Sequence, residues 1–466
     1  MKITFLGAGS TVFVRNVIGD CLVTDALRDA EYALYDIDPQ RLDDSLQMLQ
    51  NINRNANAGR ARFTTYVGLE QLDDALRDAD FAINAVQVGG YEPSTVIDFE
   101  IPKKYGLRQT IADTLGVGGV FRTLRTLPVM DDFAESAARV APNVLLLNYS
   151  NPMAMLTGYL QRYTSMKTVG LCHSVQVCAP HLMRGVGMEY DESVRWKIAG
   201  INHMGWLLEI TRDGVDLYPE IKRRSLERLE QVRQMERIPK MGEVTPEMIA
   251  AASEEEIGYG ILAMDQVRHE MMHRFGYYVT ESSEHNAEYH PWFIKSRYPE
   301  LIERYNIPLD EYPRRCVEQI AGWRQMRDSL TGDSDLSHDR THEYASYIME
   351  AIVTNRPYTI GGNVLNTGLI ENLPREACVE VPCLVDANGV TPTYVGKLPE
   401  ILAALNRTNI NVQLLTIEAY RTKKREDLYR AVMLDPHTAA ELSIDDIVAM
   451  CDEMLEAHGD MMPTFS

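Results

Sequence analysis

The sequence predicts an α/β protein, with a parallel sheet covered by helices over residues 1–195 and an α+β domain over residues 196–466. Short runs that are apolar at every position recur in the first 200 residues, between stretches of helical period. Strands of that kind are buried on both faces, which is typical of a parallel sheet. A chain of 466 residues also exceeds the usual size of one hydrophobic core. The expected strands are residues 2–6, 33–36, 81–86, 143–149 and 167–171.

The first expected strand runs into a glycine-rich turn, and the second ends on an acid. Glycines let the backbone approach a pyrophosphate at a helix N-terminus, and the acid accepts hydrogen bonds from a ribose. Val12 stands where the usual fingerprint has a third glycine. We expect a Rossmann-like NAD site in which Asp36 disfavours the 2′-phosphate of NADP. The residues expected to contact the dinucleotide are Gly7, Gly9, Ser10, Thr11, Asp36 and Gln87.

Beyond residue 195 the pattern becomes mixed. The apolar run 194–200 is followed by Asp213-Gly214, which predicts a hairpin turn. Residues 216–275 are charged and have a helical period. The polar, Met-rich run 235–256 predicts a surface insertion or a lid.

Composition restricts the classes of partner. The formal net charge of −21 argues against nucleic acids and anionic membranes. No run approaches the roughly 18 apolar residues of a membrane span, and the chain opens on a strand rather than a leader peptide, so we expect a cytoplasmic protein. The seven cysteines are scattered and form neither a disulfide framework nor a CxxC zinc pattern.

Four segments place polar residues where a fold usually has none: 109–114, 148–152, 172–174 and 200–204. Cys172 ends a strand on the side where ligands bind in parallel sheets. A thiolate and an imidazole can together hold a divalent metal, which makes Cys172 and His203 candidate metal ligands, although nothing local brings together two residues that lie 31 positions apart. Taken alone, such a cysteine and such a histidine are more often structural, and an Asn-Pro after a strand is more often a turn.

Taken together, these segments resemble glycoside hydrolase family 4, the NAD- and manganese-dependent glycosidases, over nearly the whole chain. The resemblance is closest to the α-galactosidase branch of that family. The matching segments are residues 5–11, 109–114, 170–176, 199–204, 280–285 and 435–440.

The resemblance implies a fold related to lactate and malate dehydrogenases, with NAD and Mn²⁺ or another divalent metal as cofactors. Its mechanism departs from two-carboxylate displacement. NAD⁺ oxidises C3 of the sugar, a base removes the C2 proton, the glycosidic oxygen leaves C1, water adds, and hydride returns. The implied partner is a small α-galactoside such as melibiose, in a homo-oligomer that is a dimer or tetramer. Asn151 and Asp113 are the implied substrate-binding residues; the alternative for Asn151 is a turn cap.

The catalytic residues implied by the resemblance are Cys172, His173 and Glu284. His173 stands where the 6-phosphoglycosidase branch has Asp or Asn. It is expected either to act as the general acid or only to orient the metal ligands. Counting back from Pro291 puts Glu284 in the position of the base, with Glu281 and Tyr289 as less favoured candidates.

Three alternatives remain open at this point. One is another glycosidase of the family: an α-glucosidase, an α-galacturonidase or a 6-phospho-glycosidase. Arg304, Arg314 and Arg315 could bind a 6-phosphate, although His173 and the net charge argue against it. The others are a 2-hydroxyacid or polyol dehydrogenase and a non-catalytic dinucleotide sensor, neither of which needs the Cys172–His203 pair.

Overall fold

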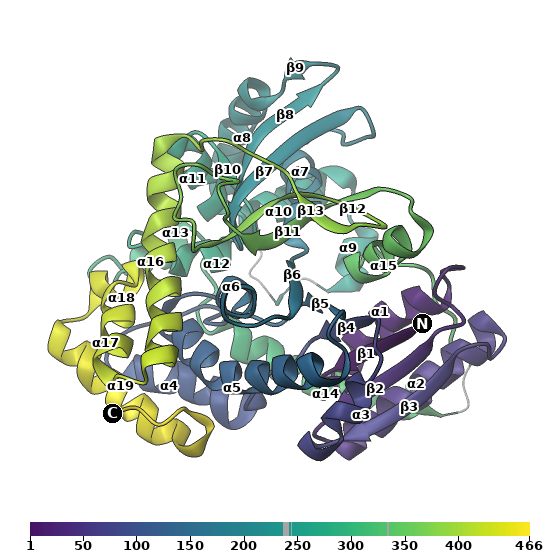
Figure 1. Cartoon of the computed structure of the whole chain (residues 1–466). Helices are drawn as coiled ribbons and strands as arrows, with labels where there is room; N and C mark the ends of the chain where they lie inside the picture. The colour runs from purple at the N-terminus through teal and green to yellow at the C-terminus, as the bar shows by residue number, and fades with distance from the viewer. Residues whose placement is uncertain (236–241, 244, 333–334) are drawn as a thin grey trace.

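The computed structural model describes residues 1–235, 242–243, 245–332 and 335–466 (Figure 1). The expected run 235–256 therefore lies partly outside the described residues. Its described part contains helix α9 (Pro246–Ala251) and the start of α10 (Glu254–Met264).

Six parallel strands form the N-terminal half of one sheet, in the order β3-β2-β1-β4-β5-β6. Residues of β1 are buried from Ile3 to Leu6, as the apolar runs predicted. The five expected strands are all present, with ends that differ by a few residues. The bounds are β1 Lys2–Leu6, β2 Glu31–Asp36, β3 Arg62–Val67, β4 Phe81–Asn84, β5 Leu145–Asn148 and β6 Lys167–Leu171.

Strands from the C-terminal part extend the same sheet beyond β6 instead of forming a separate one. They follow in the order β11-β12-β7-β8-β10 with antiparallel pairing, and β9 and β13 are short additions to β8 and β12. The expected turn Asp213-Gly214 joins β8 to β9. The bounds are β7 Val194–Ile201, β8 Met204–Arg212, β9 Val215–Asp216, β10 Tyr278–Val279, β11 Tyr358–Leu365, β12 Cys378–Asp386 and β13 Gly389–Pro392. The predicted α/β class with a C-terminal α+β part is confirmed, whereas the boundary at residue 195 stays a prediction.

Helices of the first half alternate with the parallel strands and cover the sheet. Helix α2 illustrates the local cause: Asp38 accepts hydrogen bonds from the backbone N–H groups of Gln40 and Arg41, and Pro39 opens the first turn. The bounds are α1 Val12–Leu22, α2 Pro39–Asn57, α3 Leu72–Leu76, α4 Val96–Lys104, α5 Gly116–Val140, α6 Met153–Tyr163 and α7 Ser174–Gly185.

Helices of the second half fall into two groups in Figure 1. The last helices of the chain pack against α4, α5 and α6, and the others surround the antiparallel strands or reach α2. The bounds are α8 Tyr218–Arg233, α11 Gln266–Phe275, α12 Ser283–Glu288, α13 Glu300–Arg304, α14 Glu311–Thr331, α15 Tyr344–Thr354, α16 Glu400–Thr422, α17 Arg425–Met433, α18 Pro436–Glu441 and α19 Ile444–His458.

A buried ionic group fastens the end of α19 to α4 and α5. Arg125 donates two hydrogen bonds to Asp98, at 3.1 and 2.6 Å, and His458 Nε2 lies 3.0 Å from Asp98. Arg125 also donates to the carbonyl of Val88. Through this group the C-terminal helix supports the loop that follows β4.

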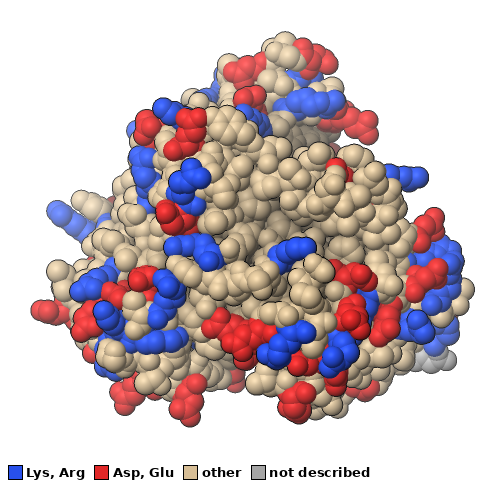
Figure 2. Space-filling model, viewed as in Figure 1, with Lys and Arg blue, Asp and Glu red and all other residues tan. Residues whose placement is uncertain are grey.

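Acidic and basic side chains alternate around the rim of the face in Figure 2, and its centre is largely uncharged. Among the described residues, no helix is both long and apolar enough to cross a membrane.

Candidate active site

The glycine turn after β1 is shaped by direct contacts that leave no room for side chains. A Cβ on Gly7, whose φ is +88°, would lie 2.9 Å from the carbonyl carbon of Ala85. The backbone N–H of Gly9 donates to Asp36 Oδ2 at 2.6 Å. Ser10 Oγ is buried without a hydrogen-bond partner in the described part of the chain. The expected nucleotide residues therefore meet at one edge of the sheet, with a donor left for a ligand.

Two further nucleotide candidates lie at the same edge. Thr11 is buried and immediately precedes α1, and Gln87 follows β4. Gln87 Oε1 accepts a hydrogen bond from Tyr312 at 3.2 Å. The first residues of α14 thus reach the loop beside the nucleotide turn.

Cys172, His203 and Glu281 form a cluster that suits a metal ion. One ligand atom from each lies within 4.8 Å of the others. Glu281 Oε2 is 3.4 Å from His203 Nε2 and 3.8 Å from Cys172 Sγ. The sequence-predicted pair of ligands is brought together, and Glu281 is added to it.

Both His203 and Glu281 adopt a left-handed backbone conformation, with φ of +63° and +62°. Non-glycine residues there cost of the order of 1–3 kcal/mol and concentrate at functional sites. His203 Nδ1 is hydrogen-bonded to the hydroxyl of Tyr289 at 3.0 Å, which turns Nε2 toward the cluster. The fold therefore maintains a strained arrangement that aims the ligand atoms at one point.

The charges of the cluster fit a cation. Burial lowers the pKa of His203, which favours the neutral imidazole that ligation requires. Burial alone would raise the pKa of Glu281, but His203 and His285 lower it to about 2, so this carboxylate is ionised. Burial and the charge of Glu281 raise the pKa of the Cys172 thiol. A bound cation would supply the positive charge that favours the thiolate.

His285 and Asp113 extend the cluster toward the loop before α5. His285 lies between two carboxylates, with Nδ1 3.7 Å from Glu281 Oε1 and Nε2 3.6 Å from Asp113 Oδ1. Burial opposes the charged imidazole, but these acids raise the pKa of His285 to about 9. Asn151 Nδ2 lies 3.5 Å from Asp113 Oδ2, and Asn151 Oδ1 is buried with no described partner. The two predicted substrate residues therefore meet beside the metal cluster.

Glu288, which the sequence did not single out, holds the loop that carries Asp113. Its carboxylate accepts the backbone N–H groups of Thr110, Ile111 and Ala112, at 2.8, 3.2 and 2.8 Å. Burial raises the pKa of Glu288 to about 7, against the effect of these hydrogen bonds. The position of Glu288 one turn beyond the predicted base is the only sequence signal for this role.

His173 lies at the rim of the site, next to Cys172. Its Nε2 is 2.5 Å from Glu343 Oε2, and its ring stacks on Tyr149 with the centroids 5.9 Å apart. Burial lowers the pKa of His173, but the hydrogen bond that it donates to Glu343 outweighs this effect, and the net pKa lies above the usual value. The protonated form that a general acid needs is thereby favoured.

Glu284, the preferred base from the sequence, is engaged elsewhere. Its Oε1 pairs with Arg315 Nη2 at 2.7 Å, and Arg315 also pairs with Glu311. Glu281, which counting along the chain ranked lower, is the carboxylate that lies with Cys172 and His203. The geometry therefore moves the candidate base from Glu284 to Glu281.

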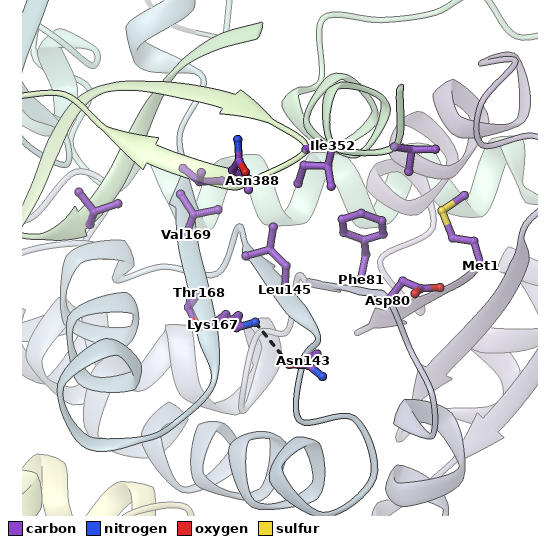
Figure 3. A pocket seen from close by; sticks show the side chains of 15 residues that line it. Met1, Asp80, Phe81, Asn143, Leu145, Lys167, Thr168, Val169, Ile352 and Asn388 are labelled. Atoms are coloured by element: carbon purple, nitrogen blue, oxygen red, sulfur yellow. Dashed lines mark hydrogen bonds between the residues drawn. The ribbon is translucent and has the colours of Figure 1, made fainter. Parts of the chain in front are cut away.

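A separate cavity of about 830 Å³ lies at the opposite edge of the sheet, among residues at the starts of β4, β5 and β6 (Figure 3). Its charged side chains are Asp80 and Lys167; Asp80 accepts the backbone N–H of Lys2, and Lys167 approaches Asn143 at 3.5 Å. None of the predicted site residues lines it.

Protein-family models match almost the whole chain. Residues 2–188 match the model of the family 4 glycosyl hydrolases, and residues 198–438 match that of the family 4 glycosyl hydrolase C-terminal domain.

Individual relatives agree with the family match. An α-galactosidase of Bacillus subtilis (strain 168) is 56% identical over 467 residues, covering 100% of this chain and 99% of the relative. An α-galactosidase of Rhizobium meliloti (strain 1021) is 32% identical, covering 100% and 90%. A 6-phospho-α-glucosidase from gut microorganisms, solved in complex with NAD and Mn²⁺, superposes with a TM-score of 0.74 at 19% identity, covering 100% and 99%.

Proposed function

Because the chain belongs to family 4 of the glycosyl hydrolases, we propose that it is an α-galactosidase that uses NAD and a divalent metal, Mn²⁺. The 56% identity to an α-galactosidase over the full chain supports the substrate class. The observation that carries the cofactor assignment is the Cys172–His203–Glu281 cluster, at the strand edge that also holds the glycine turn. Simple hydroxyacid dehydrogenases and dinucleotide sensors need no such cluster.

The donor set fits the metal, and the turn fits the dinucleotide. Cys172, His203 and Glu281 offer one sulfur, one nitrogen and one oxygen from buried or half-buried positions. Carboxylate and imidazole suit Mn²⁺, and the softer thiolate lowers the selectivity for it. The unpartnered Ser10 Oγ and the Gly9–Asp36 contact fit a pyrophosphate and a ribose. When bound, NAD and the metal would supply reversible hydride transfer at C3 and Lewis-acid polarisation at O2 and O3 of the sugar.

The residues of the chain supply the proton transfers. Two of the three base candidates, Glu281 and Tyr289, lie at the cluster, and burial raises the pKa of Tyr289 far above neutrality. Glu281 is ionised and is therefore the proposed base for the C2 proton. His173, held by Glu343, is the proposed acid for the glycosidic oxygen. Departure of that oxygen with loss of the C2 proton is an elimination. Water then adds a hydroxyl at C1 and a proton returns to C2, so the glycosidic oxygen is replaced and the net change is hydrolysis.

Asn151 and Asp113 orient the sugar in this proposal. Asn151 Oδ1 has no hydrogen-bond partner among the described residues, and His285 lies 3.6 Å from the Asp113 carboxylate. The pKa of Asp113 stays below its usual value because His285 and Arg122 outweigh the effect of burial. An ionised Asp113 accepts hydrogen bonds from sugar hydroxyls.

Two of the three arginines considered for a 6-phosphate, Arg314 and Arg315, are neutralised by acids. Arg315 pairs with Glu284 and Glu311, and Arg314 pairs with Glu311 and Glu318. Guanidinium groups already bound to carboxylates are poor receptors for a phosphate dianion. The pairing supports an unphosphorylated substrate.

The proposal is tested by hydrolysis of p-nitrophenyl α-galactoside with and without NAD⁺, Mn²⁺ and a thiol reductant. The α-glucoside and the 6-phosphorylated analogue serve as comparisons. We expect turnover of the galactoside only when both cofactors are present, and a lower kcat/KM for the phosphorylated analogue. Activity that persists after both cofactors are removed would refute the assignment. The cytoplasmic location, the dimer or tetramer and the domain boundary remain predictions.

A further inference from the structure

Arg122 is a buried cation at the edge of the proposed sugar site. Only 7% of the residue is exposed, yet it forms no ion pair with any described residue. Among the described residues, the one hydrogen bond of its guanidinium runs from Nη1 to the hydroxyl of Tyr312, at a long 3.4 Å. Buried charges are normally paired, so this guanidinium has bonding capacity left for a ligand.

Arg125, one turn further along α5, shows the contrast. Its guanidinium is bound by both carboxylate oxygens of Asp98, and it also donates to the carbonyl of Val88. Arg315 is likewise neutralised, by Glu284 and Glu311. Of these three arginines, Arg122 is the one with no carboxylate ion pair in the part of the chain that the structure describes.

The packing of α5 places Arg122 beside the loop of Asp113. A Cβ on Gly118 would lie 2.6 Å from the carbonyl oxygen of Ala112, so the first turn of the helix packs directly on this loop. Arg122 follows Gly118 by four residues and shares its helix face. The electrostatic attraction between Arg122 and Asp113 acts on both residues.

On its other side Arg122 meets the nucleotide edge. Its guanidinium lies over the ring of Tyr312, 5.7 Å from the centroid, and the Tyr312 hydroxyl donates to Gln87. Asp113 itself reaches the metal cluster through His285. Arg122 is therefore connected to Gln87 through Tyr312, and to the metal cluster through Asp113 and His285.

We propose that Arg122 is a specificity-determining residue that donates hydrogen bonds to an oxygen on C4 or C6 of the substrate sugar. The inference rests on the proposed function, in which a bound metal would polarise O2 and O3 and the leaving group departs from C1. The remaining hydroxyl oxygens of a galactoside are those on C4 and C6. A guanidinium with free N–H groups is a strong and directional donor to such oxygens.

The test compares Arg122→Gln and Arg122→Lys with Arg139→Gln, a matched change at the exposed end of the same helix, where Arg139 pairs with Asp73. Kinetics with p-nitrophenyl α-galactoside and its 4-deoxy and 6-deoxy analogues give KM and kcat. Binding of NAD is measured separately by fluorescence, and folding by thermal unfolding.

We expect Arg122→Gln to raise KM for the galactoside about 10- to 100-fold, the loss of one charge-assisted hydrogen bond, with unchanged affinity for NAD. Arg122→Lys should recover part of the loss, and Arg139→Gln should behave as wild type. For one of the two deoxy analogues, KM of the wild type should rise by the same factor that Arg122→Gln causes with the parent galactoside. With that analogue, Arg122→Gln should raise KM no further.

An unchanged KM in folded Arg122→Gln, or a parallel loss of NAD affinity, would overturn the proposal. If Arg122→Gln does not fold, the wild type alone decides. The proposal would be overturned if the wild type had the same KM for both deoxy analogues as for p-nitrophenyl α-galactoside. Failure of the proposed function itself is distinct, because wild-type protein with NAD⁺ and Mn²⁺ would then hydrolyse no α-galactoside.

Discussion

The hydroxyl of Tyr289 orients His203, so its removal should weaken metal binding without touching a ligand atom. In Tyr289→Phe the 3.0 Å hydrogen bond to His203 Nδ1 is lost. Both side chains are buried, with exposures of 0% and 4%, so water does not readily replace the hydroxyl. An unsatisfied buried polar group costs about 1–3 kcal/mol. Loss of such an orienting partner typically weakens metal affinity about 10- to 100-fold.

The assay is a titration of the NAD-loaded protein with Mn²⁺, with free ion followed by electron paramagnetic resonance. The dissociation constant should rise by that factor in Tyr289→Phe, and saturating Mn²⁺ should restore most of the activity. Tyr159→Phe is the control, because that hydroxyl binds Asp131 instead. An unchanged dissociation constant in folded Tyr289→Phe would refute the orienting role.

Three further outcomes follow from the site. Asp36→Ala should weaken NAD binding and reduce the preference for NAD over NADP, as measured by equilibrium titration with both nucleotides. Equal affinity of the wild type for NAD and NADP would contradict the assignment. Glu281→Gln should abolish removal of the C2 proton, whereas Glu284→Gln should retain a measurable rate of this step. Kinetics with C2-deuterated substrate test this, and the reverse ranking would restore Glu284 as the base. Burial lowers the pKa of His285, but Glu281 and Asp113 outweigh this effect and raise it to about 9, from about 6.5 in the unfolded chain. Protonation of His285 therefore stabilises the fold fully below pH 6.5. That contribution, of the order of a few kcal/mol, is lost between pH 6.5 and 9, so urea unfolding of metal-free protein should show a smaller alkaline loss in His285→Gln.

The sequence predicted the features that depend on local pattern. The apolar runs identify the parallel strands, and the turn at Gly7 and Gly9 with Asp36 is readable because strand, turn and acid follow in one unit. Cys172 and His203 were paired although 31 residues separate them, because their segments match a known family. In the structure, ligand atoms of the two residues lie within 4.8 Å of each other, which supports that inference.

Long-range contacts account for what the sequence could not rank. Glu281, Glu284 and Glu288 lie within eight residues, and counting along the chain favoured Glu284. In the structure the three glutamates differ in their partners, which are distant in sequence. Glu284 pairs with Arg315, and Glu288 accepts hydrogen bonds from the loop 110–112. The left-handed conformation of Glu281 has no sequence signature, because glycine or asparagine usually occupies such positions.

The account claims that hydrolysis passes through removal of the C2 proton, and one measurement tests this most directly. Melibiose is hydrolysed in D₂O by the protein loaded with NAD⁺ and Mn²⁺, and the galactose product is examined by NMR. If the C2 proton is removed and replaced from solvent, the product carries deuterium at C2. Galactose that retains its original hydrogen at C2 would contradict the elimination and return the protein to a displacement mechanism.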